Sequence, residues 1–187
     1  ARVVLADEQQ EPGGSLLSEK TAMIGGKPAA EWLASAVNEL GKLAEVKLLT
    51  RTTAFAYYDH NALSLIERVT DHLGPTANRP RQRLWRIRAR KVILATGAIE
   101  RPLVYLDNDR PGCITASAAR TYINRFGVMP GRRVVLMTNN DSAYRAALDL
   151  ANAGVTIPVV VDLRTEPKGA LVDAARAKGI EVLAGHA

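Results

Sequence analysis

The residues best suited to bind a ligand follow the first apolar segment of this chain. Asp7 and Glu8 come directly after "RVVLA", and Gly13 and Gly14 follow shortly after them. The second strand of a dinucleotide-binding fold ends in such an acid, whose carboxylate accepts hydrogen bonds from the adenosine ribose hydroxyls. A carboxylate there also repels the 2′-phosphate of NADP, which favours NAD or FAD. We expect Glu8 to anchor the ribose and its neighbours to contribute contacts: Asp7, Gln9, Gly13, Gly14 and Ser15.

A second candidate segment is "KVILATG", residues 91–97, which predicts a buried strand ending in Ala95, Thr96 and Gly97. One interpretation is a tight turn. The other is that three residues with little side chain let the backbone pass close to the pyrophosphate of a cofactor. Each segment alone is also explained by ordinary structure, either solvated carboxylates or a turn. Together they favour a cofactor site.

Strands and helices must alternate to position these residues. A buried strand is expected over residues 1–8, a glycine-bearing loop over 11–17 and an amphipathic helix over 27–43. Two β segments follow, 46–59 and 62–69, joined by a turn. The inward face of the predicted helix consists of Ala29, Leu33, Ala36, Val37 and Leu40.

The second half of the chain predicts a helix over 115–127 and then a β-α-β-α-β unit over 132–184, which is typical of parallel sheets. In the first helix Thr115 is the expected N-cap, and the inward side chains are Ala119, Tyr122, Ile123 and Phe126. We therefore expect an α/β fold. It comprises an incomplete Rossmann-like FAD/NAD(P)-binding domain, 1–130, with a β insertion at about 46–90, and a second unit, 131–187.

The second unit is a degenerate nucleotide-binding unit. Its first turn, residues 138–143, has no glycine where a dinucleotide-binding turn has G-x-G-x-x-G. Asp141 would repel a phosphate there and is better interpreted as a helix N-cap. We expect this unit to serve structure or subunit contact.

Basic residues concentrate in "RPRQRLWRIRARK", residues 79–91, whose seven cations exceed the whole net charge of +6 of this 187-residue chain. From Leu84 onward the residues alternate between two faces, which predicts a strand. One face carries Trp85, Ile87 and Ala89, and the other Arg86, Arg88 and Arg90. The charged face is interpreted as a solvated edge, as a docking surface for an acidic partner subunit, or as a nucleic-acid site. The segment lacks the interleaved aromatic residues with which a nucleic-acid site would stack bases, so we expect no nucleic-acid partner.

Several classes of protein are excluded by composition. Apolar residues make up 47% of the chain and charged residues 24%, which is typical of a globular protein and not of a disordered one. The single cysteine excludes an internal disulfide and a CxxC redox pair, and three scattered histidines predict no metal site. No apolar run approaches the roughly 18 residues of a membrane span. We expect a cytoplasmic protein.

Two of these segments resemble a known family. "VVLADEQQEPGGSLL" and the stretch from "ARKVILATGAIERPL" to "YRAALDLANAG" are similar to the alpha subunits of heterotetrameric sarcosine oxidases, within the two-dinucleotide-binding flavoprotein superfamily. The resemblance extends over nearly the whole chain and is most specific over 89–154. It implies a central fragment of an NAD-binding subunit, with FAD possible at the same site. It also implies beta, gamma and delta partner subunits, and FAD and FMN carried by other subunits.

The resemblance implies oxidative demethylation of sarcosine to glycine, with folate accepting the one-carbon unit and oxygen reduced to hydrogen peroxide. In this family the amine-oxidising site involves the beta subunit, so no catalytic residue is assigned here. The family's GxGxxG loop would precede residue 1, and we expect the fragment alone to be inactive. Alternatives are a subunit of an opine oxidase or hydrogen cyanide synthase, an NADH-dependent flavin reductase, or a non-catalytic scaffold with a vestigial nucleotide site.

Overall fold

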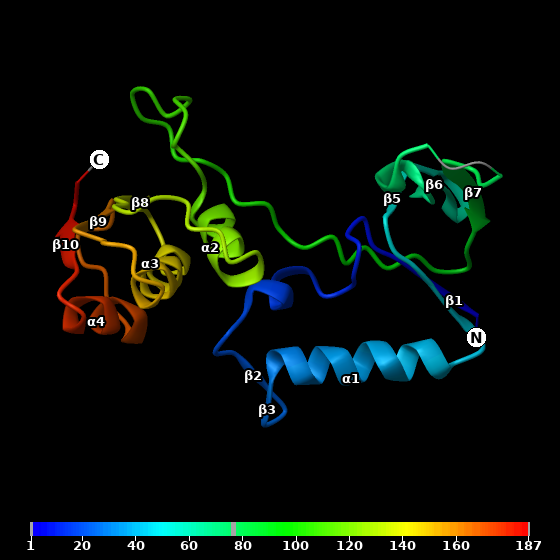
Figure 1. The fold of residues 1–187 in the computed structure, drawn as a ribbon, viewed down its shortest axis with the longest axis horizontal. Coiled ribbons are helices and arrows are strands. Elements are labelled where there is room, and N and C mark those ends of the chain that lie inside the picture. Colours follow the sequence, from blue (N-terminus) through cyan, green and yellow to red (C-terminus); the bar gives the residue numbers. More distant parts are fainter. Residues whose placement is uncertain (1, 76–77, 187) are drawn as a thin grey trace. The chain divides into compact units, whose positions relative to one another are not determined.

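Parallel and antiparallel sheets occur together in this chain, which confirms the predicted α/β class. The computed structural model describes residues 2–75 and 78–186 (Figure 1). The chain packs as two compact units, unit 1 (Ala1–Gly97) and unit 2 (Ala98–Ala187). The domain limits expected from the sequence, 1–130 and 131–187, stay a prediction. No helix of the described residues has both the length and the apolarity needed to cross a bilayer.

Unit 1 begins with a parallel strand-helix-strand motif. Strand β1 (Val3–Ala6) pairs in parallel with β4 (Val46–Leu49), and helix α1 (Ala29–Lys42) connects them. Pro28 precedes the helix with φ −52°, a value that suits a helix start. Between β1 and α1 lie the 3₁₀ turn η1 (Gly14–Ser18) and a short hairpin of β2 (Met23–Ile24) and β3 (Lys27–Pro28).

The predicted inward face of α1 is confirmed. Ala29 is buried, and the other four residues of that face are half-buried while most of the remaining helix is exposed. Strand β1, in contrast, was expected to be buried and is not: Val3, Val4 and Leu5 are 41–48% exposed. Its sheet has only two strands among the described residues, so much of the strand surface remains uncovered.

An antiparallel sheet of three strands completes unit 1. Strand β5 (Thr52–Tyr58) pairs with β6 (Ala62–Arg68), and β6 pairs with β7 (Gln82–Arg88), with 3₁₀ turns at η2 (Asp59–Asn61) and η3 (Asp71–Leu73). The single β segment expected over 46–59 is two strands of different sheets. The break falls at residues 50–51, where Arg51 adopts φ +51°. A residue in this left-handed conformation cannot continue an extended strand.

Unit 2 contains the predicted parallel β-α-β-α-β motif. Its sheet has the order β10-β9-β8, with all neighbours parallel. The elements in chain order are α2 (Ala116–Arg125), β8 (Leu136–Thr138), α3 (Ser142–Asn152), β9 (Val159–Asp162), α4 (Ala170–Ala177) and β10 (Glu181–Ala184). Their core is centred on fully buried residues of α3, β9 and α4, among them Leu150, Val160 and Val172.

Helix α2 is held to α3 by a half-buried polar contact. The guanidinium of Arg120 donates to the carboxylate of Asp149 at 2.6 Å, and Asn124 donates to the same carboxylate oxygen at 2.7 Å. The N-cap prediction for Thr115 is confirmed, since its hydroxyl accepts from the Ala118 N–H at 3.4 Å. This cap satisfies one of the amides that the first turn of a helix leaves without an internal partner.

The strand predicted at residues 91–97 is absent. Residues 91–100 adopt no regular structure, and Ile93 and Leu94 are 89% and 70% exposed. A strand needs a neighbour to pair its amides and carbonyls, and among the described residues none pairs with this segment. The expectation of a buried strand was therefore wrong for this chain.

Candidate functional site

The loop that follows β1 is held in place by backbone hydrogen bonds to the start of β5. Asp7 donates its N–H to Leu49 O at 2.9 Å and accepts from Thr52 N at 2.8 Å. The Gln9 carbonyl accepts from Arg51 N at 2.7 Å. Residues 7–9 are thus fixed at the carboxyl end of the parallel pair β1–β4, which is the end where open α/β sheets bind their ligands.

Two guanidinium groups also hold this loop, and the sequence alone offered no reason to expect them. Arg68 donates to the carbonyl of Glu8 at 3.0 Å, and Arg51 donates to the side-chain oxygen of Gln10 at 3.1 Å. Both arginines come from β5–β6 and its approach, 41 to 60 residues along the chain from the loop. We call residues 7–10 the acidic loop and assign the two arginines as residues that position it.

The two acids of the loop have different environments. Asp7 is half-buried, and its carboxylate accepts from the Gln9 N–H at 2.9 Å, so this carboxylate stabilises the turn itself. Glu8 is exposed, and no described residue donates to its carboxylate. A carboxylate that must accept from both ribose hydroxyls has to be free to do so. The geometry therefore favours Glu8 over Asp7 as the ribose anchor.

The glycine turn lies at the start of η1 and packs against α1. Gly13 has φ +142°, and a Cβ at this position would come within 2.5 Å of Leu33 Cδ2 and 3.0 Å of Leu17 Cγ. Gly14 has φ +53° with open space around it, and Ser15 is exposed. Glycine is thus required at position 13 by the backbone conformation and by packing. At Gly14 no atom lies within 4 Å of the position of a Cβ, so the backbone is open to a ligand there.

We expect Gly13→Ala to destabilise unit 1 by about 1–3 kcal/mol, because an L-residue is strained at this φ and its methyl group collides with Leu33. Native-state hydrogen exchange of α1 amides in the full-length protein measures this. Gly41→Ala is the matched control. Gly41 lies inside α1 with ordinary φ and nothing near its Cβ, so alanine should stabilise the helix by about 0.5–1 kcal/mol. Equal effects from the two variants would contradict the packing role of Gly13.

The remaining predicted site residues are not joined to this loop. Ala95, Thr96 and Gly97 are exposed, and among the described residues none forms a hydrogen bond with them. Gly97 adopts φ +70°, and no atom lies within 4 Å of the position of a Cβ there. The structure thus brings together Asp7, Glu8 and Gln9, with the glycine turn on the same β1–α1 connection. Among the described residues, no hydrogen bond joins 95–97 to them.

Unit 2 contains a buried ionic cluster that the sequence did not reveal. Asp162, at the carboxyl end of β9, is fully buried and accepts from the Tyr144 hydroxyl at 2.7 Å. Arg164 donates to both oxygens of the same carboxylate, at 3.0 and 2.7 Å, and pairs through its third nitrogen with Asp141 at 2.8 Å. A signal was present in the sequence, an acid ending an apolar strand two residues before an arginine.

The cluster shifts the pKa values of its members. Burial and the hydrogen bond to Asp162 raise the pKa of Tyr144 to about 12. Burial alone would raise the pKa of Asp162, but hydrogen bonds from Arg164 and Tyr144 outweigh it, so the pKa of this carboxyl is lowered. The folded unit therefore favours a neutral phenol beside an ionised carboxylate.

Asp141 occupies the N-cap position of α3, as predicted, but its side chain makes no capping hydrogen bond. Its carboxylate is paired with Arg164, and the side chain of Asn140 accepts from the Ser142 N–H at 2.9 Å in its place. The turn from β8 to α3, where a dinucleotide-binding unit would hold phosphates, is therefore occupied by ion-paired side chains.

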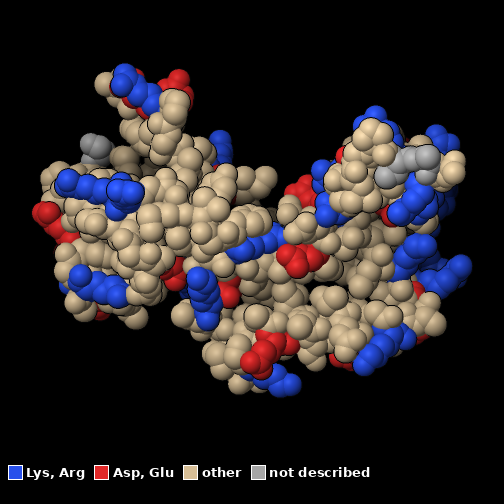
Figure 2. Space-filling view, in the orientation of Figure 1, with Lys and Arg blue, Asp and Glu red and all other residues tan. Residues whose placement is uncertain are grey.

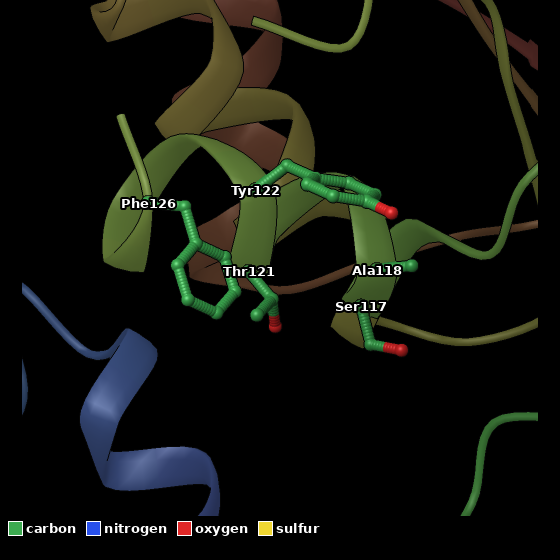
Figure 3. A pocket seen from close by; sticks show the side chains of 5 residues that line it. All are labelled: Ser117, Ala118, Thr121, Tyr122 and Phe126. Atoms are coloured by element: carbon green, nitrogen blue, oxygen red, sulfur yellow. The ribbon is translucent and has the colours of Figure 1, made fainter. Parts of the chain in front are cut away.

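Two aromatic side chains, one on α2 and one at its C-cap, point away from the core. Tyr122 and Phe126 are 46% and 54% exposed and line a shallow hollow of about 310 Å³ together with Ser117, Ala118 and Thr121 (Figure 3). The prediction that both side chains point inward was wrong. Ala119 and Ile123 hold the core face, Tyr122 is turned about 100° around the helix from Ile123, and Phe126 follows the last helical residue.

Sequence comparison finds relatives over nearly the whole chain. It is 50% identical over 165 residues to the sarcosine oxidase alpha subunit of Rhizobium meliloti (strain 1021) and 45% identical over 187 residues to that of Corynebacterium sp. (strain P-1). These alignments cover 88% and 99% of this chain but only 17% and 19% of those proteins. An opine oxidase subunit from Agrobacterium tumefaciens (strain Ach5) is 29% identical, over 92% of this chain and 34% of its own length. The resemblance expected from the sequence is confirmed.

No protein-family model matches the sequence. Solved structures with a similar fold include L-proline dehydrogenase from P. horikoshii, with a TM-score of 0.66 and 24% identity over 90% of this chain and 32% of that one. Bacillithiol disulfide reductase from Bacillus cereus has a TM-score of 0.59 and 14% identity over 97% of this chain and 60% of that one. The chain thus shares its fold with parts of these two proteins.

Proposed function

We propose that this chain is a segment of the alpha subunit of a sarcosine oxidase and that it provides part of a dinucleotide site in a multi-subunit oxidoreductase. The observation that carries the proposal is the acidic loop after β1. Its Glu8 carboxylate is exposed and unpaired among the described residues, and the loop is fixed to β5 by backbone bonds. Sequence identity of 42–50% to sarcosine oxidase alpha subunits supports the choice of enzyme.

The residues of this loop fit a ligand that carries a ribose. Glu8 would accept hydrogen bonds from its two hydroxyls, with Asp7 and Gln9 shaping the loop. Backbone at Gly13, Gly14 and Ser15 would contact the ligand, and Ala95, Thr96 and Gly97 complete the proposed set. The free carboxylate of Glu8 would disfavour a 2′-phosphate, so we propose NAD, with FAD as the other candidate.

The reaction we propose for the whole enzyme removes two electrons from the secondary amine of sarcosine. The methyl carbon leaves as a one-carbon unit accepted by folate, glycine is released, and oxygen takes the electrons to form hydrogen peroxide. Flavins on other subunits, beta, gamma or delta, would supply the electron transfer in a cytoplasmic complex. We assign no residue of this chain to the chemical step. Its proposed role is to bind the dinucleotide.

We expect no sarcosine-dependent peroxide from the isolated 187-residue chain, because it spans only 17–19% of the length of the related alpha subunits. The full-length protein assembled with its partner subunits should produce peroxide from sarcosine. A coupled peroxidase assay measures both. Turnover by the isolated chain would contradict the partner-subunit role, and a complex that oxidises an opine but not sarcosine would move the assignment to opine oxidase.

A further inference from the structure

Strand β7 presents a face of basic residues that the site described above does not use. In an antiparallel sheet, residues directly opposite each other share a face. The register pairs Arg88 with Ala62 and Ala62 with Tyr58, and it pairs Arg86 with Ser64. We call this surface the arginine face and define it as Tyr58, Ala62, Ser64, Leu84, Arg86 and Arg88. It has no acidic residue, and Arg90 follows two residues beyond Arg88.

On the opposite face of β7, the cations have partners within unit 1. Arg83 pairs with Glu67 at 3.0 Å, and the Trp85 indole donates to the same carboxylate oxygen at 2.8 Å. Lys47 lies 4.8 Å from the centre of the Trp85 ring. That face is therefore satisfied within unit 1.

The cations of the arginine face and the neighbouring Arg90 have no such partners. Arg86, Arg88 and Arg90 are exposed, and among the described residues no carboxylate or ring contacts them. Figure 2 shows lysine and arginine side chains gathered over the part of unit 1 that holds β5–β7. Exposed apolar surface lies beside them, because Leu84 and Tyr58 are 56% and 59% exposed.

The spacing of these groups fits an acidic polypeptide. Arg86 and Arg88 are alternate residues of β7, which lie about 7 Å apart, and Arg90 follows just beyond the end of the strand. Their guanidinium groups can pair with carboxylates on alternate residues of an extended partner segment. Leu84 and Tyr58 would add apolar contact, which a sugar-phosphate backbone would not use. Nucleic-acid sites neutralise more phosphates than three, typically about 6–10.

We propose that the arginine face is a docking surface for an acidic segment of a partner subunit. This inference rests on the proposed function, because the related proteins are named as subunits of an oxidase. To the proposed function it adds the surface that contacts the partner subunit and the acidic character of the partner segment.

The test uses the full-length protein co-expressed with its partner subunits and measures the dissociation constant of the complex at about 0.15 M salt. Changing Arg86, Arg88 and Arg90 together to Glu should raise this constant at least 10-fold. Lysine at the same three positions keeps the charge and should stay within about 3-fold of wild type. The matched control reverses three exposed cations elsewhere, Lys20, Arg132 and Arg133, which also contact no described side chain, and should leave the constant unchanged.

A salt titration and a glutamine variant test whether the contact is ionic. Raising the salt to about 0.5 M should weaken wild-type assembly toward that of the Glu variant, because the ionic contacts are screened. Glutamine at the three positions, which removes charge without reversing it, should give an intermediate loss and serves if the Glu variant does not fold.

Equal dissociation constants for the Glu variant and the control variant would overturn the docking surface. So would intact assembly combined with lost binding of a single-stranded oligonucleotide. A wild-type protein that assembles with no subunit would overturn the proposed function and this inference with it, whereas assembly that ignores the substitutions would overturn this inference alone.

Discussion

Replacing Asp162 by alanine is expected to destabilise unit 2 by about 3–5 kcal/mol. The substitution removes a fully buried carboxylate that accepts from Tyr144 and from both forks of Arg164. Its removal leaves the buried Tyr144 hydroxyl without its acceptor and leaves Arg164 with Asp141 as its remaining ion-pair partner. Breaking such a cluster costs more than the net contribution of the intact pair. Native-state hydrogen exchange of β9 and α4 amides in the full-length protein measures the loss.

Asp173→Ala is the control for this experiment, since Asp173 is 73% exposed and its nearest cation, on Arg176, lies at 3.9 Å. Its loss should stay within about 0.5 kcal/mol. An Asp162 variant that loses less than about 1 kcal/mol would contradict the structural role of the cluster.

The same cluster makes unit 2 sensitive to alkali. The folded pKa of Tyr144, about 12, lies above its ordinary value of 10.0. A raised pKa stabilises the fold below the ordinary value, and this contribution is lost as the pH rises through the folded pKa. We therefore expect unit 2 to lose about 2–3 kcal/mol between pH 10 and 12. Tyr144→Phe should remove this dependence, so the measurement also identifies its source.

Replacing Glu8 by alanine in the full-length protein should weaken NAD binding roughly 10-fold to more than 100-fold. Two charge-assisted hydrogen bonds to the ribose are lost, each worth about 1.5–3 kcal/mol. Discrimination against NADP should also relax, because the carboxylate no longer repels its 2′-phosphate. Titration calorimetry with NAD and NADP measures both effects.

Glu39→Ala provides the matched control, because Glu39 is an exposed acid on α1 and contacts no described side chain. Its NAD affinity should equal that of wild type. If Glu8→Ala also binds NAD as wild type does, Glu8 is an ordinary surface acid and the proposed site is wrong.

Much of the local structure could be predicted because local sequence decides it. The helix over 27–43 and the strand around Arg86 and Arg88 follow from the periods of their apolar residues. Thr115 as a cap follows from its hydroxyl next to a helical pattern. These interactions lie within a few residues of one another along the chain.

Several errors concern interactions between distant residues. Residues 91–97 have the composition of a buried strand, but a strand forms only where another strand offers its backbone groups. The i, i+3 spacing from Ala119 predicts that Tyr122 points inward, but Tyr122 lies about 100° around the helix from Ile123 and is 46% exposed. The spacing of apolar residues shows neither which strand will pair with a given strand nor how wide the buried face of a helix is.

The fold class, most of the elements, the two-faced arginine strand and the resemblance to sarcosine oxidase alpha subunits can all be predicted from the order of residues. The folded chain was needed to show that Asp7 stabilises its own turn while Glu8 stays free, and that Arg51 and Arg68 hold this loop. It also assembled Asp162 with Tyr144 and Arg164. The physical reason is the same in each case: the role of a polar side chain depends on which groups approach it, and folding brings many of those groups from distant parts of the chain.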